Sequence, residues 1–424
     1  MLERFPESFM WGATLHSHCV EGEHFDSNWW RWEQRPGNIG DGSNSQYGVD
    51  HWNRYGDDIR LAGEFGMNTL LITFEWSRIQ PSRDVFDEGA LRHYQEVLEA
   101  CGEHEITAIC AMQHVTLPQW MAAKGGWSNS ESPEWFRDYA KRIVEELGEL
   151  CGYWIPVHEG MHGLVEGYQQ GHWPPERRSP GGLEAATRHQ VAAHGFAYTR
   201  IKECCPDAQV GLSVRVGLHV PGNPYSAWDA RIALREGRRN NDRMLDELAA
   251  GSDEAPIDFL GVSYFGQRAV SMRWRSVSTS FVEYLSGDGD GSDCMACAEG
   301  FGELLDSCGS YSLPIFVLGN GCAHVTDEEQ CGYLLDHVEV VREAIARGVD
   351  IRGYVYHSLL NGFEWDQGYA RRYGLMVVDR ERMTRSPNSI ALLYKELCET
   401  GMVRDAMVAK FCPERMRTRE DVLS

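Results

Sequence analysis

The chain has 424 residues, 42% of them hydrophobic, which suits either about two or three average domains or one α/β barrel with insertions. A net charge of −23 without a basic stripe argues against nucleic acid as a partner, and no apolar run approaches the length of a membrane span. Thirteen cysteines without framework spacing, and an N-terminus without the pattern of a secretion signal, predict reduced thiols in the cytoplasm.

Short apolar runs typical of buried strands recur along the chain, and stretches with helical periodicity separate them. The eight predicted strands are Phe9–Ala13, Thr69–Trp76, Ile106–His114, Tyr153–Glu159, Gln209–Val216, Ile257–Phe265, Leu313–Asn320 and Ile351–Leu360. Between strands, His51–Phe65 and Asp327–Arg347 repeat apolar residues along one helical face. This alternation predicts an α/β fold, a single (β/α)8 TIM barrel that forms one domain over residues 1–424.

An open doubly wound sheet is the alternative fold. It would place a glycine-rich phosphate loop after the first strand, and the segment Trp11–Gly22 lacks that glycine spacing. The Gly/Ser/Asp-rich stretch Ser286–Asp293 is interpreted as a flexible loop inserted after the sixth strand. Cys294 and Cys297 could form a metal knuckle with Cys308, but no second pair follows at zinc spacing, so incidental cysteines are the simpler interpretation.

The carboxyl ends of barrel strands are where this fold places its chemistry. Here they carry polar and aromatic residues: His16, His18, Cys19, Trp76, Arg78, Gln113, His114, His158, Glu159, Tyr264, Gly319, Asn320, His357, Glu364 and Trp365. Glu159 is the strongest single candidate, because a carboxyl group that closes an apolar strand starts inside the barrel mouth, where burial suits it to proton transfer. The alternative role for Glu159 is a structural ion pair with Arg78.

Several motifs resemble those of glycoside hydrolase family 1, the retaining β-glycosidases that include β-glucosidases. They cover nearly the whole chain: FMWGA from Phe9, VEG from Val20, WSRI from Trp76, LPQW from Leu117, DFLG from Asp258, SLL from Ser358, FEW from Phe363 and YGL from Tyr373. The resemblance implies a barrel enzyme that acts on a small-molecule glycoside or an activated sugar. It implies no cofactor.

The catalytic motifs depart from the family pattern. The family's acid/base motif, Asn-Glu-Pro, reads HEG from His158, so the glutamate is kept as Glu159. The family's nucleophile motif, Thr-Glu-Asn-Gly, reads LGNG from Leu318, which puts Gly319 at the nucleophile position. The resemblance therefore assigns catalysis to Glu159 and His158. It also implies that no glycosyl-enzyme ester forms at Gly319.

Around these positions, some residues of the family's sugar site are retained in this sequence and others are replaced. Cys19 replaces the glutamine that contacts the sugar, Phe265 replaces the tyrosine beside the nucleophile, and His357 replaces the tryptophan at the floor of the sugar site. The resemblance assigns substrate binding to Cys19, Arg78, His114, Tyr264, Asn320, His357, Glu364 and Trp365.

Three functions are compatible with a missing nucleophile. In the first, a glycosidic bond or glycosyl donor reacts by a non-retaining route, with Glu159 as acid/base and the leaving group in the space beside Gly319. In the second, the site performs different, metal-dependent chemistry. The candidate ligands for that chemistry are Cys19, His114, His158, Glu159 and His357. In the third, the protein binds a glycoside without catalysis, which leaves the retained Glu159 and Glu364 unexplained.

Overall fold

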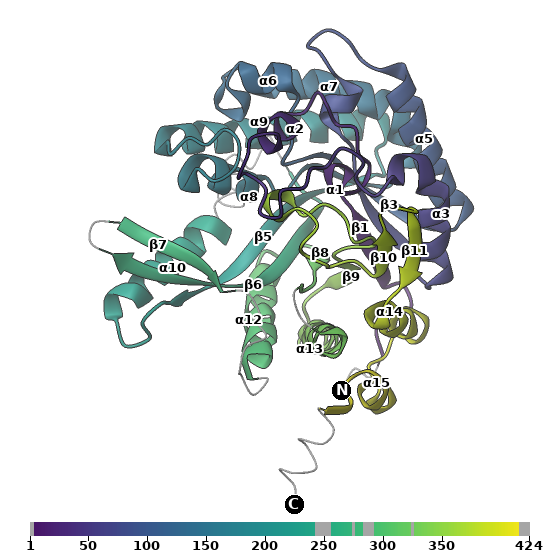
Figure 1. The fold of residues 1–424 in the computed structure, drawn as a ribbon, viewed down its shortest axis with the longest axis vertical. Helices are drawn as coiled ribbons and strands as arrows, with labels where there is room; N and C mark the ends of the chain where they lie inside the picture. Colours follow the sequence, from purple (N-terminus) through teal and green to yellow (C-terminus); the bar gives the residue numbers. More distant parts are fainter. Residues whose placement is uncertain (1–3, 242–255, 274–275, 283–291, 324–325, 415–424) are drawn as a thin grey trace, which may run out of the picture.

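The computed structural model describes residues 4–241, 256–273, 276–282, 292–323 and 326–414, and Figure 1 shows their arrangement. Eight parallel strands form the barrel: β1 (Met10–Leu15), β2 (Thr69–Thr73), β3 (Thr107–His114), β4 (Tyr153–His158), β5 (Gln209–Pro221), β6 (Phe259–Arg273), β8 (Ile315–Asn320) and β9 (Ile351–Tyr356). Neighbouring strands pair in the order β5-β4-β3-β2-β1-β9-β8-β6, and the pairing of β5 with β6 closes the ring. The predicted (β/α)8 barrel is confirmed, and the open sheet is excluded. That it forms one domain over residues 1–424 stays a prediction.

Helices cover the outside of the barrel (Figure 1). The α-helices are α1 (Ser17–Val20), α2 (Asn28–Glu33), α3 (His51–Glu64), α4 (Trp76–Ile79), α5 (Glu88–Glu103), α6 (Gln119–Ala123), α7 (Ser132–Leu147), α8 (Gly160–Leu164), α9 (Pro180–Cys204), α10 (Ala227–Asn241), α12 (Ser292–Gly309), α13 (Asp327–Ala346), α14 (Ser389–Thr400) and α15 (Asp405–Phe411). The short helical segments are η1 (Gly126–Ser128), η2 (Gly148–Leu150), η3 (Val165–Gln170) and η4 (Trp365–Gln367). The two predicted helices correspond to α3 and α13. A capping box between Thr326 and Glu329 fixes the start of α13.

Two antiparallel pairings were not predicted. Strand β6 continues past the barrel and pairs with β7 (Ser276–Val282), so that Gln267 lies opposite Val282. In Figure 1 this hairpin projects from the barrel beside α10. The second pairing joins β10 (Met376–Asp379) to β11 (Thr384–Pro387).

The apolar core has two main layers. The larger one lies between the barrel strands and the helices. A small cluster unites side chains from six strands: Leu71, Ile109, Ala111, Ile155, Phe259, Phe316, Leu318 and Val355. Only the inside of a closed barrel brings side chains from so many strands together, so this cluster is the barrel interior. It leaves the carboxyl ends of the strands free to form a site.

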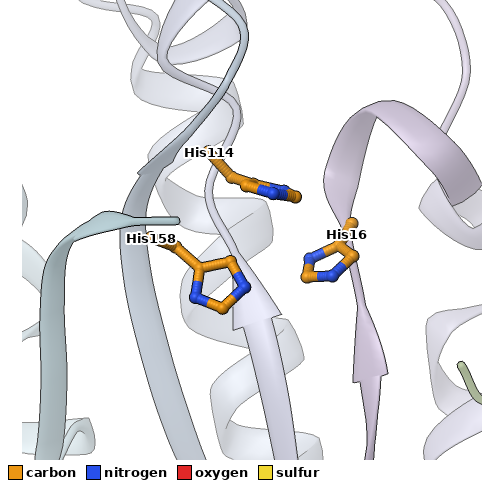
Figure 2. A group of neighbouring side chains, drawn as sticks. All are labelled: His16, His114 and His158. Atoms are coloured by element: carbon orange, nitrogen blue, oxygen red, sulfur yellow. The ribbon is translucent and has the colours of Figure 1, made fainter. Parts of the chain in front are cut away.

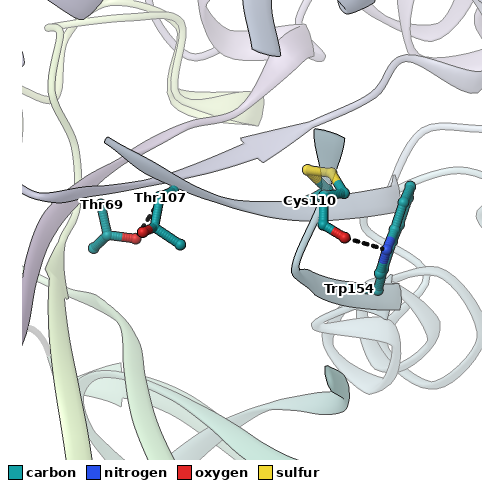
Figure 3. Close-up of a disulfide and its surroundings, with 5 residues drawn as sticks. Thr69, Thr107, Cys110 and Trp154 are labelled. Atoms are coloured by element: carbon teal, nitrogen blue, oxygen red, sulfur yellow. Dashed lines mark hydrogen bonds between the residues drawn. A yellow bond between two sulfur atoms is a disulfide. The ribbon is translucent and has the colours of Figure 1, made fainter. Parts of the chain in front are cut away.

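A disulfide joins Cys110 of β3 to Cys151, two residues before β4 begins (Figure 3). The indole Nε1 of Trp154 donates a hydrogen bond to the carbonyl oxygen of Cys151 at 3.1 Å. The prediction that all cysteines are reduced is therefore wrong for this pair. Neighbouring parallel strands bring the two Cα atoms within 6.6 Å, a distance that suits a disulfide, whereas the separation of 41 residues gave no sequence signal.

Some predicted features fall outside the described residues. Most of Ser286–Asp293 does so, and so do the side chains of Cys294 and Cys297. Cys308 is described, and it is a buried free cysteine near the end of α12. Within the described part of the chain, no helix combines the length and the apolar character that a membrane crossing requires.

Candidate active site

A cavity of about 210 Å³ opens at the carboxyl ends of the barrel strands. Predicted site residues that line it are His114, Glu159, His357, Glu364 and Trp365. Residues that were not assigned to the site also line it, among them His16, Arg215 and Tyr373. The cavity therefore collects ionisable and aromatic side chains from both halves of the barrel.

Glu159 directly follows β4 and is 5% exposed. Its backbone has φ 47°, in the left-handed region that non-glycine residues seldom adopt and that is often found at functional sites. Its Oε2 lies 3.8 Å from Nη1 of Arg215 and 4.0 Å from Nε2 of His114. Its Oε1 lies 3.9 Å from Nε2 of His158. The carboxylate is thus buried within 4.0 Å of three side-chain nitrogen atoms.

Arg78 has a different partner from the one proposed. Its Nε lies 3.4 Å from Oε2 of Glu21, its Nη2 donates to the carbonyl oxygen of Gly22, and its guanidinium stacks 3.8 Å from the ring centre of Trp52. The alternative of an Arg78–Glu159 ion pair is therefore wrong. Arg78 does not line the cavity, so its contacts in the described structure are with the protein scaffold.

Arg215 of β5 supplies the cation beside Glu159. Its guanidinium lies 4.3 Å from the ring centre of Phe265, which also lines the cavity. Sequence reasoning missed Arg215. The available signal was a charged residue inside the apolar run Gln209–Val216, at a position that a buried strand rarely gives to arginine.

Three histidines converge from the ends of three strands: His16 after β1, His114 at the end of β3 and His158 at the end of β4 (Figure 2). The ring centres of His16 and His114 are 4.3 Å apart, those of His114 and His158 are 4.7 Å apart, and those of His16 and His158 are 5.2 Å apart. Burial and the neighbouring imidazoles hold the pKa values of His16 and His114 well below the usual range. Burial lowers the pKa of His158 to about 4, although Glu159 opposes the shift. All three rings are therefore neutral at neutral pH.

His357 is held by two hydrogen-bonding contacts. Its Nδ1 lies 3.0 Å from Oγ1 of Thr14, and its Nε2 lies 3.3 Å from Oε2 of Glu364. Both ring nitrogens therefore have partners, and the contact also orients the carboxylate of Glu364. Trp365 follows in the chain, and its ring meets that of His114 edge-on with centres 5.3 Å apart.

Gly319 lies in β8, one residue before the strand ends. A Cβ atom added there would lie 3.1 Å from Oγ of Ser263 and 3.3 Å from Cζ of Phe265. A side chain at residue 319 would therefore crowd Ser263 and Phe265, which would have to give way by a few tenths of an ångström. The open space for a leaving group beside Gly319 stays a prediction. Glycine fits here since its neighbours leave little room for a side chain.

Four of the predicted substrate-binding residues do not line the cavity: Cys19, Arg78, Tyr264 and Asn320. Cys19 is buried in the core after α1 begins, and burial raises the pKa of its thiol. The side-chain amide of Asn320 donates to the carbonyl oxygen of Tyr264 at 2.8 Å, and Asn320 accepts from the hydroxyl of Tyr354 at 2.6 Å. The other four predicted substrate-binding residues, His114, His357, Glu364 and Trp365, lie together in the cavity.

A larger cavity of about 440 Å³ lies beside η1 and α8. Its lining includes Gln113, Leu117, Trp127, Gly160 and Tyr168. The ionisable residues that line it, Arg31, Arg35, Glu176 and Arg177, are all exposed. We place the chemistry in the smaller cavity, because that one holds the buried carboxylates and imidazoles.

Comparisons with known proteins agree with this architecture. The family model of glycosyl hydrolase family 1 matches residues 1–256 and 254–402. Beta-glucosidase A of Thermotoga maritima is 25% identical, over 95% of this chain and 100% of its own length. Beta-glucosidase 42 of Arabidopsis thaliana is 28% identical, over 92% of this chain and 93% of its own.

Solved structures give the same result. The beta-glycosidase from Pyrococcus horikoshii superposes with a TM-score of 0.88 at 26% identity, over 97% of this chain and 99% of its own. The beta-glucosidase from Thermotoga maritima in complex with glucoimidazole superposes with a TM-score of 0.84 at 25% identity, over 94% of this chain and 100% of its own.

Proposed function

Because this chain belongs to glycosyl hydrolase family 1, we propose that it acts on a small glycoside or an activated sugar by a non-retaining route, with Glu159 as the acid/base. The observation that carries the proposal is the environment of Glu159. Its carboxylate is buried in the cavity at the barrel mouth, 3.8 Å from Nη1 of Arg215. Gly319, near the end of β8, supplies no second carboxylate.

The retaining route requires two carboxyl groups roughly 5–5.5 Å apart, one of which attacks the anomeric carbon. Gly319 has no side chain, and a Cβ atom there would crowd Ser263 and Phe265. Glu364 is another carboxylate in the cavity, but it faces His357 at 3.3 Å. We therefore infer a direct displacement with inversion at the anomeric carbon, and no covalent sugar–enzyme ester at residue 319.

In this route the cavity residues divide the work. Glu159 removes the proton of the incoming water or alcohol while its oxygen bonds to the anomeric carbon. The bond to an activated leaving group, a phosphate or a nucleotide, breaks on the opposite face, and that group departs as an anion with the bonding electrons. Glu364 and His114 offer hydrogen bonds to sugar hydroxyls, and the ring of Trp365 offers an apolar surface for the sugar. A glucoimidazole complex of the Thermotoga maritima relative supports a sugar-sized ligand for this chain.

The stereochemistry of the first product tests the proposal. The protein is incubated with a panel of aryl glycosides, sugar phosphates and nucleotide sugars, with water or small alcohols as acceptors, and NMR identifies the anomer formed first. We expect inversion. Retention, or a covalent adduct with a fluorosugar inhibitor, would show that another residue acts as nucleophile. Binding of sugars without turnover of any donor would favour a glycoside-binding protein instead.

A further inference from the structure

His16, His114 and His158 form a histidine cluster, of which the proposed sugar chemistry uses only His114. One ring nitrogen from each of the three histidines can be chosen so that the three atoms lie within 4.8 Å of one another. Among the described residues, Nδ1 of His16 and both ring nitrogens of His158 have no hydrogen-bond partner, although the side chains are buried. Buried polar groups without partners are uncommon, and a bound ion is one of their explanations.

We propose that His16, His114 and His158 together bind one divalent transition-metal ion of the zinc type. This inference goes beyond the proposed function and does not depend on it. Three neutral imidazoles with an open fourth position are a ligand set that Zn²⁺ uses in proteins, and other ions that prefer nitrogen ligands share it. The histidines come from three rigid strand ends, which is how a barrel can present ligands that are far apart in the sequence.

The geometry needs only a small adjustment to hold such an ion. With metal–nitrogen bonds of about 2.0–2.1 Å, a tetrahedral centre places its nitrogens roughly 3.3 Å apart. The nitrogens here lie within 4.8 Å of one another, so shifts on the order of an ångström in the side chains would close the site. One ion would then accept the lone pairs of all three rings.

A purely hydrogen-bonded cluster is the competing explanation, and the contacts disfavour it. No hydrogen bond links any two of the three described rings, and Nδ1 of His16 and both nitrogens of His158 lack a partner. Leaving a buried acceptor unpaired is unfavourable, because the group loses its hydrogen bonds to water and gains none in return. His357 shows the contrast, because Thr14 and Glu364 occupy both of its nitrogens. That pairing excludes His357 from the ligand set, and the core position of Cys19 excludes Cys19.

The surroundings also suit a cation. Glu159 places Oε2 4.0 Å from Nε2 of His114 and Oε1 3.9 Å from Nε2 of His158, so a carboxylate offsets part of the added charge. His16 and His114 line the cavity, whereas His158 is fully buried and does not line it. The fourth position is therefore open, through the cavity, to a water molecule or to an oxygen of the substrate.

The test is a titration of the untagged, chelator-treated protein with Co²⁺ alone, followed by visible absorbance and calorimetry. We expect one Co²⁺ per chain, the visible bands of a tetrahedral centre, displacement by Zn²⁺ and a higher melting temperature with metal. No substrate is needed, so failure of the proposed function would not affect the result. A wild-type protein that binds no Co²⁺ would overturn the proposal.

Variants localise the site. His16→Gln should weaken Co²⁺ binding by more than the ~10–100-fold that outer-shell partners contribute to metal sites. His337→Gln is the matched control, since His337 is a buried histidine on α13 that takes no part in the cluster, and it should bind Co²⁺ like the wild type. Circular dichroism checks that both variants fold. If His16→Gln does not fold, the wild-type Co²⁺ titration alone decides whether the protein binds a metal ion. Equal binding by His16→Gln and wild type would place the ion elsewhere and overturn the assignment.

Discussion

The Oγ atom of Ser263 lies 3.1 Å from the point where a Cβ atom on Gly319 would stand. With Cζ of Phe265 at 3.3 Å from the same point, the end of β8 is packed around a glycine. Ser263 and Phe265 both belong to the neighbouring strand β6, so a side chain at residue 319 would press against that strand.

Restoring a carboxylate at this position should not restore a retaining glycosidase. Gly319→Glu would crowd Ser263 and Phe265, and overpacking of this kind typically costs about 1–3 kcal/mol. We expect a lower free energy of unfolding in urea and no gain in aryl β-glucoside hydrolysis. Gly319→Ala is the matched control, because it adds only the crowded Cβ atom, and it should lose a similar stability. Rapid hydrolysis by Gly319→Glu would mean that the neighbours yield and that the rest of the retaining site is intact.

Loss of the Glu159 carboxylate should affect turnover rather than stability. General acid–base assistance typically contributes about 10²–10⁴-fold, so Glu159→Gln should lose roughly that factor in kcat on any substrate found. The left-handed backbone at Glu159 is unchanged by this substitution, and thermal unfolding checks that the fold survives. Glu166→Gln removes another carboxylate that lines the cavity and should show a smaller loss. If Glu159→Gln turns over the substrate as fast as the wild type, Glu159 has only a structural role.

The barrel could be predicted because each strand contains an apolar run, although β5 and β6 extend past their predicted ends at Val216 and Phe265. Ile315–Asn320, for example, differs from its predicted range by two residues at one end. The β6–β7 hairpin and the disulfide could not be predicted in this way. Both depend on which segments become neighbours in space, and neither the run Ser276–Val282 nor the spacing of Cys110 and Cys151 identifies its partner.

Only part of the site could be predicted, because a strand end shows where a side chain starts but not which way the following turn carries it. Strand ends correctly identified His114 and Glu159 as cavity residues. Cys19 was predicted as a possible metal ligand and His16 was not. The chain begins a helical turn at Ser17, which carries Cys19 into the core and leaves His16 at the mouth. Arg215 was overlooked since its apolar neighbours in the sequence suggested packing alone.

The disulfide should contribute measurably to stability. Closing a loop over 41 residues removes chain entropy from the unfolded state, and removing a native disulfide typically costs about 2–5 kcal/mol. We expect the double variant Cys110→Ala/Cys151→Ala to unfold at lower urea concentration than the wild type. Adding reductant should lower the wild-type midpoint and leave that of the variant unchanged. A wild-type midpoint that ignores reductant, together with no linked peptide in a non-reduced digest, would contradict the bond.

Glu21 should make stability fall as the pH rises towards neutrality. Burial raises the pKa of its carboxyl group from the usual 4.5 to about 7, although Arg78 at 3.4 Å opposes the shift. Because the folded-state value is the higher one, the native protein keeps a proton that the unfolded chain loses. The contribution is complete below pH 4.5 and is lost as the pH rises through about 7.

The size and origin of this effect can be measured. A shift from 4.5 to about 7 corresponds to a loss of roughly 3 kcal/mol of unfolding free energy across that pH window. Glu21→Gln keeps the hydroxyl of Tyr94 within reach of a side-chain oxygen, as at 2.9 Å in the wild type, and removes the titration. Urea unfolding of both proteins at several pH values isolates the contribution as the difference between the two curves. We expect the wild-type curve to descend more steeply than that of the variant. Parallel curves would mean that Glu21 titrates alike in the folded and unfolded chains, and the buried carboxyl group would then have no role in the pH dependence.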